Sequence, residues 1–143
     1  MTSMRLAGAG VPGAGLLLTW LLLAGCSSGL KHPVHEVTAP SEGGVQRITV
    51  TTHSFWFDPN RIVVRQGVPV ELTIRNAAFM VPHDFSCDAQ QAGISIDESV
   101  KMFHGRKVVR FTPTQAGEYP FFCDVDGHAK KHGMRGTLVV VDH

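Results

Sequence analysis

The sequence predicts an all-β protein, a single-domain Greek-key β-sandwich, and three observations support that fold class. From residue 45 onward the chain consists of short runs rich in β-branched residues, and no segment keeps the 3.6-residue period of a helix. Turn-forming sequences such as Asp58-Pro59-Asn60 separate these runs. A chain of 143 residues, less a leader, has room for one hydrophobic core and not for two. We therefore expect one domain over residues 45–143.

The expected strands are short alternating runs bounded by turn residues. They cover residues 46–52, 61–65, 68–76, 83–87, 107–112, 118–123 and 135–142. Residues 89–103 carry the weakest pattern, and we expect a loop there with a short strand or a helical turn. Phe55, Trp56 and Phe57 are consecutive aromatics. We interpret them as a strand whose alternate rings fill the core and shield the functional site described below, rather than as a platform for a sugar or a base.

The first 25 residues have the features of a secretory leader, which is removed from the mature protein. Arg5 precedes an apolar core at residues 16–23, and small residues lead to Cys26. This apolar run is far shorter than the roughly 20 residues that a membrane-spanning helix needs. The letters LAGC, ending at Cys26, resemble the bacterial lipobox, in which the cysteine is lipidated after cleavage. We expect a signal peptide at residues 1–25 and a palmitate-type lipid anchor on Cys26, which would place the protein in a bacterial cell envelope, facing the periplasm or the cell exterior.

Residues 26–44 are rich in Ser, Gly and Pro and have no apolar period, which predicts a flexible tether. About 18 such residues reach roughly 20 to 25 Å, enough to let the domain swing to a partner in the same membrane. His32 and His35 lie in this stretch, and we expect them to be solvated linker histidines. The formal net charge is only +1, so no nucleic-acid partner is expected. We expect a monomer.

Residues 119–134 read YPFFCDVDGHAKKHGM and contain a thiolate, two imidazoles and a thioether. These ligand types suit copper, because Cu(I) prefers sulfur while imidazole serves both oxidation states. Strands are expected on both sides, so the ligands lie on the loop that connects them. Upstream, His83 follows a proline and opens a short alternating strand, which makes it a candidate for the remaining ligand.

The segment NAAFMVPHDF and, about forty residues later, the segment GEYPFFCDVDGHAKKHGMRGTLVV together resemble the cupredoxin family of blue copper proteins. The resemblance covers roughly residues 48–141. It implies a single type 1 copper ion with His83, Cys123 and His128 in plane and Met134 as the weak axial ligand. The Cys-x4-His spacing is similar to that of azurin and rusticyanin. The implied function is electron transfer with redox partner proteins, and not enzymatic catalysis.

Two positions depart from the family pattern. Met134 follows His128 by six positions, which makes the loop slightly long and leaves His132 as a rival ligand. His128 is preferred, because Gly127-His128 matches the usual context of the family. The second departure is Asp84, where the family often has Asn or Ser; an ionised carboxylate accepts hydrogen bonds and does not donate them. The redox potential and the colour of the site therefore stay open.

Three alternatives remain at this point. Cys87 is interpreted as a buried hydrophobe, and its use in a dinuclear copper centre is disfavoured because that pattern needs a cysteine at Gly127. A copper-delivery module without redox cycling would favour exposed His and Met clusters, but Met80, Met102 and His104 are scattered in the sequence. The third alternative is a copper site altered by the long loop and by Asp84, which would be red or green in colour or even catalytic.

The loop also carries a basic cluster, made of Lys130, Lys131 and Arg135. In cupredoxins the loop histidine usually reaches the surface, so the resemblance places this cluster at the face where a redox partner docks. We therefore expect a partner that is acidic at that face, with ordinary solubilising charge as the alternative. The sequence does not identify the electron donor or acceptor.

Overall fold

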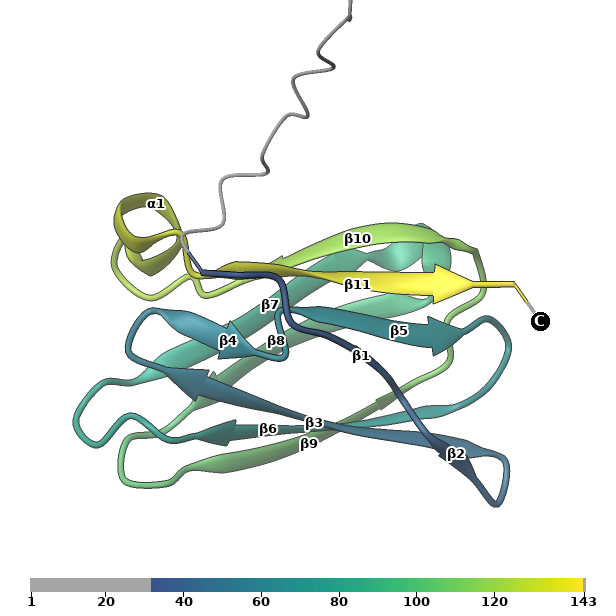
Figure 1. Cartoon of the computed structure of the whole chain (residues 1–143), viewed down its shortest axis with the longest axis horizontal. Helices are drawn as coiled ribbons and strands as arrows, with labels where there is room; N and C mark the ends of the chain where they lie inside the picture. Colours follow the sequence, from purple (N-terminus) through teal and green to yellow (C-terminus); the bar gives the residue numbers. More distant parts are fainter. Residues whose placement is uncertain (1–31, 143) are drawn as a thin grey trace, which may run out of the picture.

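The computed structural model describes residues 32–142 as two β-sheets packed face to face (Figure 1). The six-stranded sheet has the order β1-β5-β11-β10-β7-β8, and the second sheet has the order β2-β3-β6-β9, with β4 added to β3. The elements are β1 (Glu36–Thr38), β2 (Ser41–Glu42), β3 (Val45–His53), β4 (Trp56–Asp58), β5 (Arg61–Arg65), β6 (Val70–Asn76), β7 (His83–Ala89), η1 (Gln90–Ala92), β8 (Ile94–Val100), β9 (Arg106–Phe111), β10 (Gly117–Phe122), α1 (His128–His132) and β11 (Arg135–Val141). The predicted β-sandwich is confirmed.

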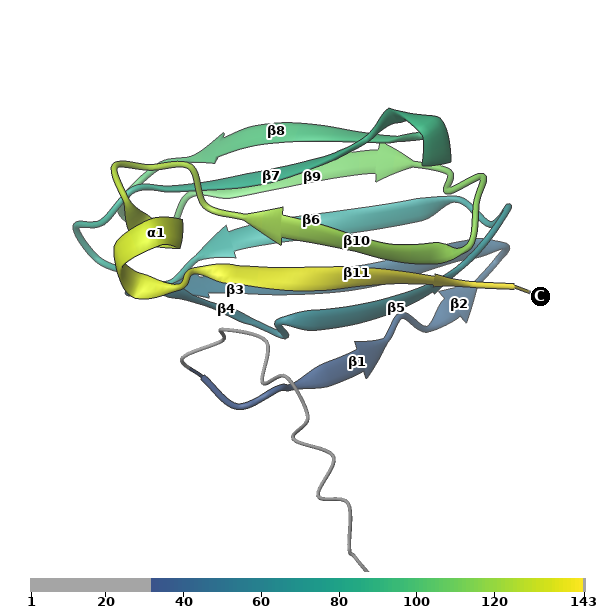
Figure 2. The same ribbon diagram turned by 90° about the horizontal axis from the view of Figure 1, so that it is seen from above.

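The pairing within each sheet is mixed. β3 runs parallel to β6, and β5 runs parallel to both β1 and β11, while the other pairs are antiparallel. Figure 2 shows β10 and β11 in the middle of the six-stranded sheet, with α1 joining them at one end. Along β7 the side chains of His83, Phe85 and Cys87 are all buried, as the alternation of the sequence predicts. The strand thus turns His83 toward the interior.

Three phenylalanine rings form the part of the core that joins the two sheets. Phe57 of β4, Phe85 of β7 and Phe121 of β10 are all fully buried. Phe57 contacts Phe85 and Phe121 edge to face at 5.6 and 5.1 Å, while Phe85 and Phe121 stack at 4.6 Å. Truncating such a ring to alanine typically costs about 3 to 5 kcal/mol. Phe57 therefore fills the core as predicted, whereas Trp56 is partly exposed.

The domain begins earlier than the sequence predicts. Residues 36–38 form β1, which pairs with β5, and residues 41–42 form β2, which pairs with β3. The side chain of Asn60 fastens the preceding residues: its Oδ1 accepts the N–H of His35 at 2.8 Å, and its Nδ2 donates to the carbonyl oxygen of Pro33 at 2.9 Å. Strands of two or three residues leave no visible period, and these contacts span about 25 residues of sequence, so the pattern did not predict them.

The second difference lies in residues 89–103, where the sequence predicted mainly a loop. β8 occupies seven of these residues and pairs with β7 along its whole length. Ile94, Ile96 and Val100 are buried, while Ser95, Asp97 and Ser99 between them are exposed on the outer face. This strand matters for the site because Val100 is the register partner of His83.

The predicted signal peptide and the predicted lipid anchor at Cys26 lie outside the described residues. Among residues 32–142, no helix is both long and apolar enough to cross a membrane.

Candidate metal centre

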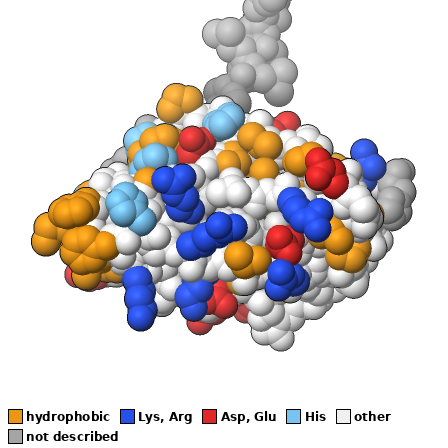
Figure 3. Space-filling model, turned by 90° about the horizontal axis from the view of Figure 1, so that it is seen from below, with side chains coloured by type: hydrophobic (Ala, Val, Ile, Leu, Met, Phe, Trp, Pro, Cys, Tyr) orange, Lys and Arg blue, Asp and Glu red, His pale blue; other side chains and the backbone are white. Residues whose placement is uncertain are grey.

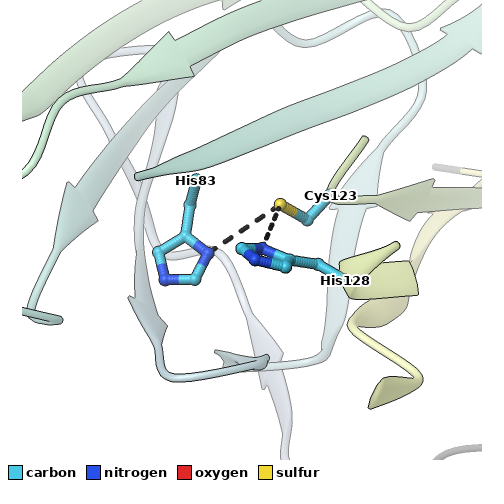
Figure 4. A group of neighbouring side chains, drawn as sticks. All are labelled: His83, Cys123 and His128. Carbon is cyan, nitrogen blue, oxygen red and sulfur yellow. Dashed lines mark hydrogen bonds between the residues drawn. The ribbon is translucent and has the colours of Figure 1, made fainter. Parts of the chain in front are cut away.

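Three potential ligands meet at one end of the sandwich (Figure 4). The Sγ atom of Cys123 lies 3.4 Å from Nδ1 of His128 and 3.8 Å from Nδ1 of His83. One donor atom from each residue lies within 4.8 Å of the others, and all three residues are buried. They come from three different segments: the start of β7, the residue after β10, and the start of α1. The two sheet strands and the helix therefore fix the spacing of the donor atoms.

His83 is positioned by the loop before it, which a buried asparagine at the end of β6 holds in place. Nδ2 of Asn76 donates to the carbonyl oxygens of Val81 at 2.8 Å and Lys101 at 3.2 Å. Its Oδ1 accepts the N–H of Ala78 at 2.8 Å. The side chain thus joins the loop before β7 to the loop after β8. Asn76 was not predicted to take part in the site. The sequence hints at such a role only by placing a polar residue at the end of an apolar strand.

Backbone hydrogen bonds connect the residues of the loop that follows β10. The N–H of Cys123 donates to the carbonyl oxygen of Met134 at 3.1 Å, and the N–H of Met134 donates to the carbonyl oxygen of His128 at 3.1 Å. Gly127 and Gly133 bound α1 with φ values of 80° and 73°, in the left-handed region that favours glycine. The extra length of the loop is therefore taken up by a short helix. Met134 is fully buried between this helix and β11.

A backbone group, and not the side chain, supplies the hydrogen bond at Asp84. The N–H of Asp84 donates to Sγ of Cys123 at 3.3 Å. Burial raises the pKa of the Cys123 thiol, and the N–H groups of Asp84 and Val125 oppose this rise by stabilising the thiolate. The carboxylates of Asp84 and Asp124 push the pKa in the same direction as burial. Replacement of the usual Asn or Ser by Asp84 thus still leaves a donor at the sulfur.

Both histidines of the cluster favour the neutral form. Burial, followed by the neighbouring His128 and His53, lowers the pKa of His83 to about 4. Burial and then His132 lower the pKa of His128, with Asp126 and Asp84 acting in the opposite direction. Neutral imidazole is the form that binds a metal, so protons do not compete for these ligands near pH 7.

A donor set of one thiolate and two neutral imidazoles, buried together, fits copper. Soft sulfur favours Cu(I), and imidazole serves Cu(I) and Cu(II) alike. Met134 is buried, and its backbone is hydrogen-bonded to Cys123 and to His128. Its side chain is a thioether, which is also a copper ligand type. A metal here would join ligands that the fold has already brought to within 4.8 Å of one another.

His132 lies outside the cluster and contacts an aromatic ring instead. Its ring stacks on Phe55 at 4.0 Å with an interplanar angle of 19°. The same Phe55 ring meets His128 edge to face at 4.9 Å. Phe55 has a φ of 77°, which is rare for a bulky residue. The prediction was that alternate rings of this stretch fill the core and shield the metal. Phe57 lies in the core, and Phe55 lies in the turn between β3 and β4, against the loop histidines.

Cys87 lies in the core of the sandwich, away from the cluster. It is a fully buried free cysteine, and burial, followed by the charge of Asp88, raises the pKa of its thiol to about 11. The group of metal-ligand side chains found in residues 32–142 contains Cys123 and not Cys87. The interpretation of Cys87 as a small buried hydrophobe is confirmed.

The other histidines take part in surface contacts. His32 and His53 stack on Trp56, with ring centroids at 5.1 and 4.3 Å. His35 forms an ion pair with Asp58. His35 is exposed, as predicted, whereas the ring of His32 is partly buried against β4.

The fold and the site together define a metal-binding β-sandwich protein. The family model described as cupredoxin-like domain matches residues 14–140, so the chain belongs to the cupredoxin-like family. This membership, with the buried His-Cys-His set, supports copper binding. No curated protein sequence matches the chain.

Solved structures share the fold at low sequence identity. The metal-binding domain of the Cu(I)-exporting P-type ATPase CopA of Streptococcus pneumoniae D39, solved with Cu(I), is 24% identical, with a TM-score of 0.58, over 77% of this chain and 99% of that domain. Rusticyanin from Thiobacillus ferrooxidans is 22% identical, with a TM-score of 0.56, over 74% and 82%. Auracyanin from Roseiflexus castenholzii is 21% identical, with a TM-score of 0.55, over 66% and 96%.

Proposed function

We propose that the protein is an electron carrier that holds one type 1 copper ion. His83, Cys123 and His128 would hold the ion, and the thioether of Met134 would supply a fourth, weaker ligand. The observation that carries the proposal is the convergence of both imidazole Nδ1 atoms on the buried sulfur, at 3.4 and 3.8 Å. When bound, copper supplies a one-electron couple between Cu(II) and Cu(I) at such a site.

The residues around the cluster keep its geometry fixed, which fast electron transfer requires. Cys123 and His128 are both hydrogen-bonded through the backbone of Met134, and His83 is set by the register of β7 with β8. Phe55 covers the ring of His128 and limits its exposed fraction to 8%. A rigid site with little access for water changes little between oxidation states, so little reorganisation opposes the transfer of an electron. The three candidate ligands are all buried, which favours a carrier over an enzyme that must admit a substrate to its metal.

The rival ligand is disfavoured by its ring contact. His132 would have to leave its stack on Phe55 to replace His128, whose Nδ1 already lies 3.4 Å from the sulfur. We therefore keep His128 as the loop ligand.

A copper-delivery module is the second candidate. One observation favours it: the loops that carry Met80 and Met102 are adjacent in the fold, and both thioethers are exposed. A delivery protein would bind Cu(I) and pass it on without cycling between oxidation states.

Membrane anchoring completes the proposal. Lipid on Cys26 would hold the protein in a bacterial cell envelope, and Lys130 and Lys131 on α1 would face an acidic redox partner. The basic cluster is expected to steer such a partner at low ionic strength.

Absorption of the Cu(II)-loaded chain tests the ligand set. We expect an intense thiolate-to-copper band near the red end of the visible spectrum, lost in Cys123→Ser and kept in Cys87→Ser. A colourless Cu(II) protein with only weak d-d absorption would contradict the carrier and favour the delivery module.

A further inference from the structure

Four exposed apolar side chains gather at the end of the sandwich that carries the metal centre. Phe79 and Met80 lie in the loop before β7 and are 66% and 67% exposed, while Met102 and Phe103 lie in the loop before β9 and are 40% and 57% exposed. The rings of Phe79 and Phe103 meet edge to face at 5.2 Å. Figure 3 shows hydrophobic side chains gathered at the left end of the molecule. We call these four side chains the apolar tip.

The two loops of the apolar tip are joined to each other. The N–H of Phe103 donates to the carbonyl oxygen of Phe79 at 3.2 Å, and Asn76 bonds to the backbone of both loops. Phe103 and His104 have φ values of 57° and 62°, an unusual conformation that non-glycine residues adopt only when their surroundings hold it. The exposure of the tip is therefore a feature of a fixed loop pair.

Three cations border the apolar tip, and we call them the cationic margin. Arg75 and Arg106 are register partners on β6 and β9, both exposed, and Lys101 begins the loop that carries Met102. Within residues 32–142, none of the three forms an ion pair. Like charges placed opposite each other repel, so this margin favours an external anionic surface.

The cations at the other end of the same sheet differ from this margin. Arg47 and Arg110 both form ion pairs with Glu71, at 3.8 and 2.7 Å. By contrast, neither segment 77–82 nor segment 101–107, which form the loops of the tip, contains an acidic residue. Uncompensated positive charge is thus concentrated beside the exposed apolar side chains.

The described chain also starts at this end. His32 stacks on Trp56 of β4, next to the end of β3, where the carbonyl oxygen of Thr52 accepts the N–H of Ala77 in the tip loop. His32 follows Cys26 by only six positions, a span of at most about 20 Å. A lipid on Cys26 would therefore keep the end with the metal centre and the apolar tip close to the bilayer.

We propose that the apolar tip and the cationic margin dock together onto the surface of an anionic lipid bilayer. The four apolar side chains enter the boundary between headgroups and acyl chains, while the three cations contact anionic headgroups. A bilayer fits better than a protein groove, because the side chains project from two loops and need no complementary shape. Docking in this orientation presents the metal-centre end to redox proteins embedded in the same membrane. The short link to Cys26 rests on the proposed anchor, whereas the docking itself is measured without it.

Vesicle binding tests the proposal on a chain that begins at Ser27. That chain has no lipid and keeps both sheets and the whole described core, which lie within residues 32–142. We expect it to co-sediment with vesicles of phosphatidylcholine and phosphatidylglycerol, more than with phosphatidylcholine alone, and to be released as salt rises. The copper band is recorded in parallel, so failure of docking and failure of the metal site are separate results.

Two pairs of substitutions on one sheet provide a matched control. Arg75→Gln with Arg106→Gln removes two cations of the margin and is expected to weaken binding roughly 30-fold at 0.1 M salt. Arg47→Gln with Arg110→Gln removes the same charge at the level of Glu71, four residues from Arg75 along β6 and roughly 13 Å away. At the same salt concentration this distance exceeds the Debye length of about 10 Å, so binding is expected to stay within about twofold.

Phe79→Ser with Met80→Ser then tests the apolar tip, with thermal unfolding as the check on the fold. These side chains are mostly exposed, so the fold is retained while binding falls roughly tenfold or more. An equal loss in both arginine pairs, or no effect of the serine pair, would overturn the proposal. So would the absence of binding to anionic vesicles, which would leave an acidic protein as the occupant of this surface.

Discussion

Replacing Phe55 by glycine removes an unfavourable backbone conformation and an aromatic cover at the same time. A non-glycine residue in the left-handed region costs roughly 1 to 2 kcal/mol, which glycine avoids. The substitution also loses two ring contacts, with His132 at 4.0 Å and His128 at 4.9 Å, worth about 0.5 to 1.5 kcal/mol each. Glycine further increases the entropy of the unfolded chain, by roughly 0.5 to 1 kcal/mol. The free energy of unfolding of the copper-free protein is therefore expected to fall by about 1 kcal/mol only.

Phe55→Leu is the matched comparison, because leucine keeps the strained backbone and loses the ring contacts. We expect it to destabilise the copper-free protein by roughly 0.5 to 1 kcal/mol more than Phe55→Gly does, measured by urea unfolding, because the relief of strain in glycine is partly offset by its entropy in the unfolded chain. Both variants uncover His128, so both are expected to lose copper faster to a competing chelator than the unchanged protein, while Phe55→Tyr retains it.

Two results would refute this reasoning. If Phe55→Gly were clearly less stable than Phe55→Leu, the left-handed backbone at this turn would not be strained. If all three variants released copper at the rate of the unchanged protein, Phe55 would have no role in covering the loop ligand.

Three further predictions concern the core and the ligands. Gly136→Ala places a methyl group into the Phe121 ring, and urea unfolding should show a loss of roughly 3 kcal/mol or more. His128→Ala should remove the copper band or open the site to added imidazole, whereas His132→Ala should leave the band nearly intact. The copper-free protein should lose stability as the pH falls from about 6.5 to about 4, by about 3 kcal/mol from His83 alone, because its lowered pKa means that the folded state binds fewer protons than the unfolded chain.

A different result in each experiment would contradict the corresponding prediction. Unchanged stability of Gly136→Ala would mean that the surrounding groups can move to admit the methyl group. Loss of the copper band in His132→Ala alone would reassign the loop ligand. A pH profile that is the same in His83→Gln would show that other groups cause the acid sensitivity.

The strands that carry the site were predictable because their alternation is regular. β7 alternates buried and half-exposed side chains from His83 onward, and its neighbour β10 does the same up to Phe122. The ligands sit at the ends of these strands, so a correct reading of the alternation also places His83 and Cys123 on the same end of the sandwich. The short Cys-x4-His spacing then keeps His128 nearby.

The parts that were not predictable depend on contacts between distant residues. β1 and β2 are too short to show a period, and they are held through pairing with β5 and β3. β8 contains several polar residues on its outer face, so that its buried positions did not stand out. The cover of Phe55 over His128 requires a left-handed turn residue, and sequence patterns do not predict phenylalanine there.

A redox titration of the copper-loaded protein, followed through its visible band, tests the central claim most directly. The account predicts that the band bleaches on reduction and returns fully on oxidation, with one electron taken up per chain and no loss of copper. The site geometry would explain this reversibility, because strands and backbone hydrogen bonds already hold the three buried ligands together without a metal. Copper that binds as Cu(I) and leaves on oxidation, with no reversible couple, would contradict the account.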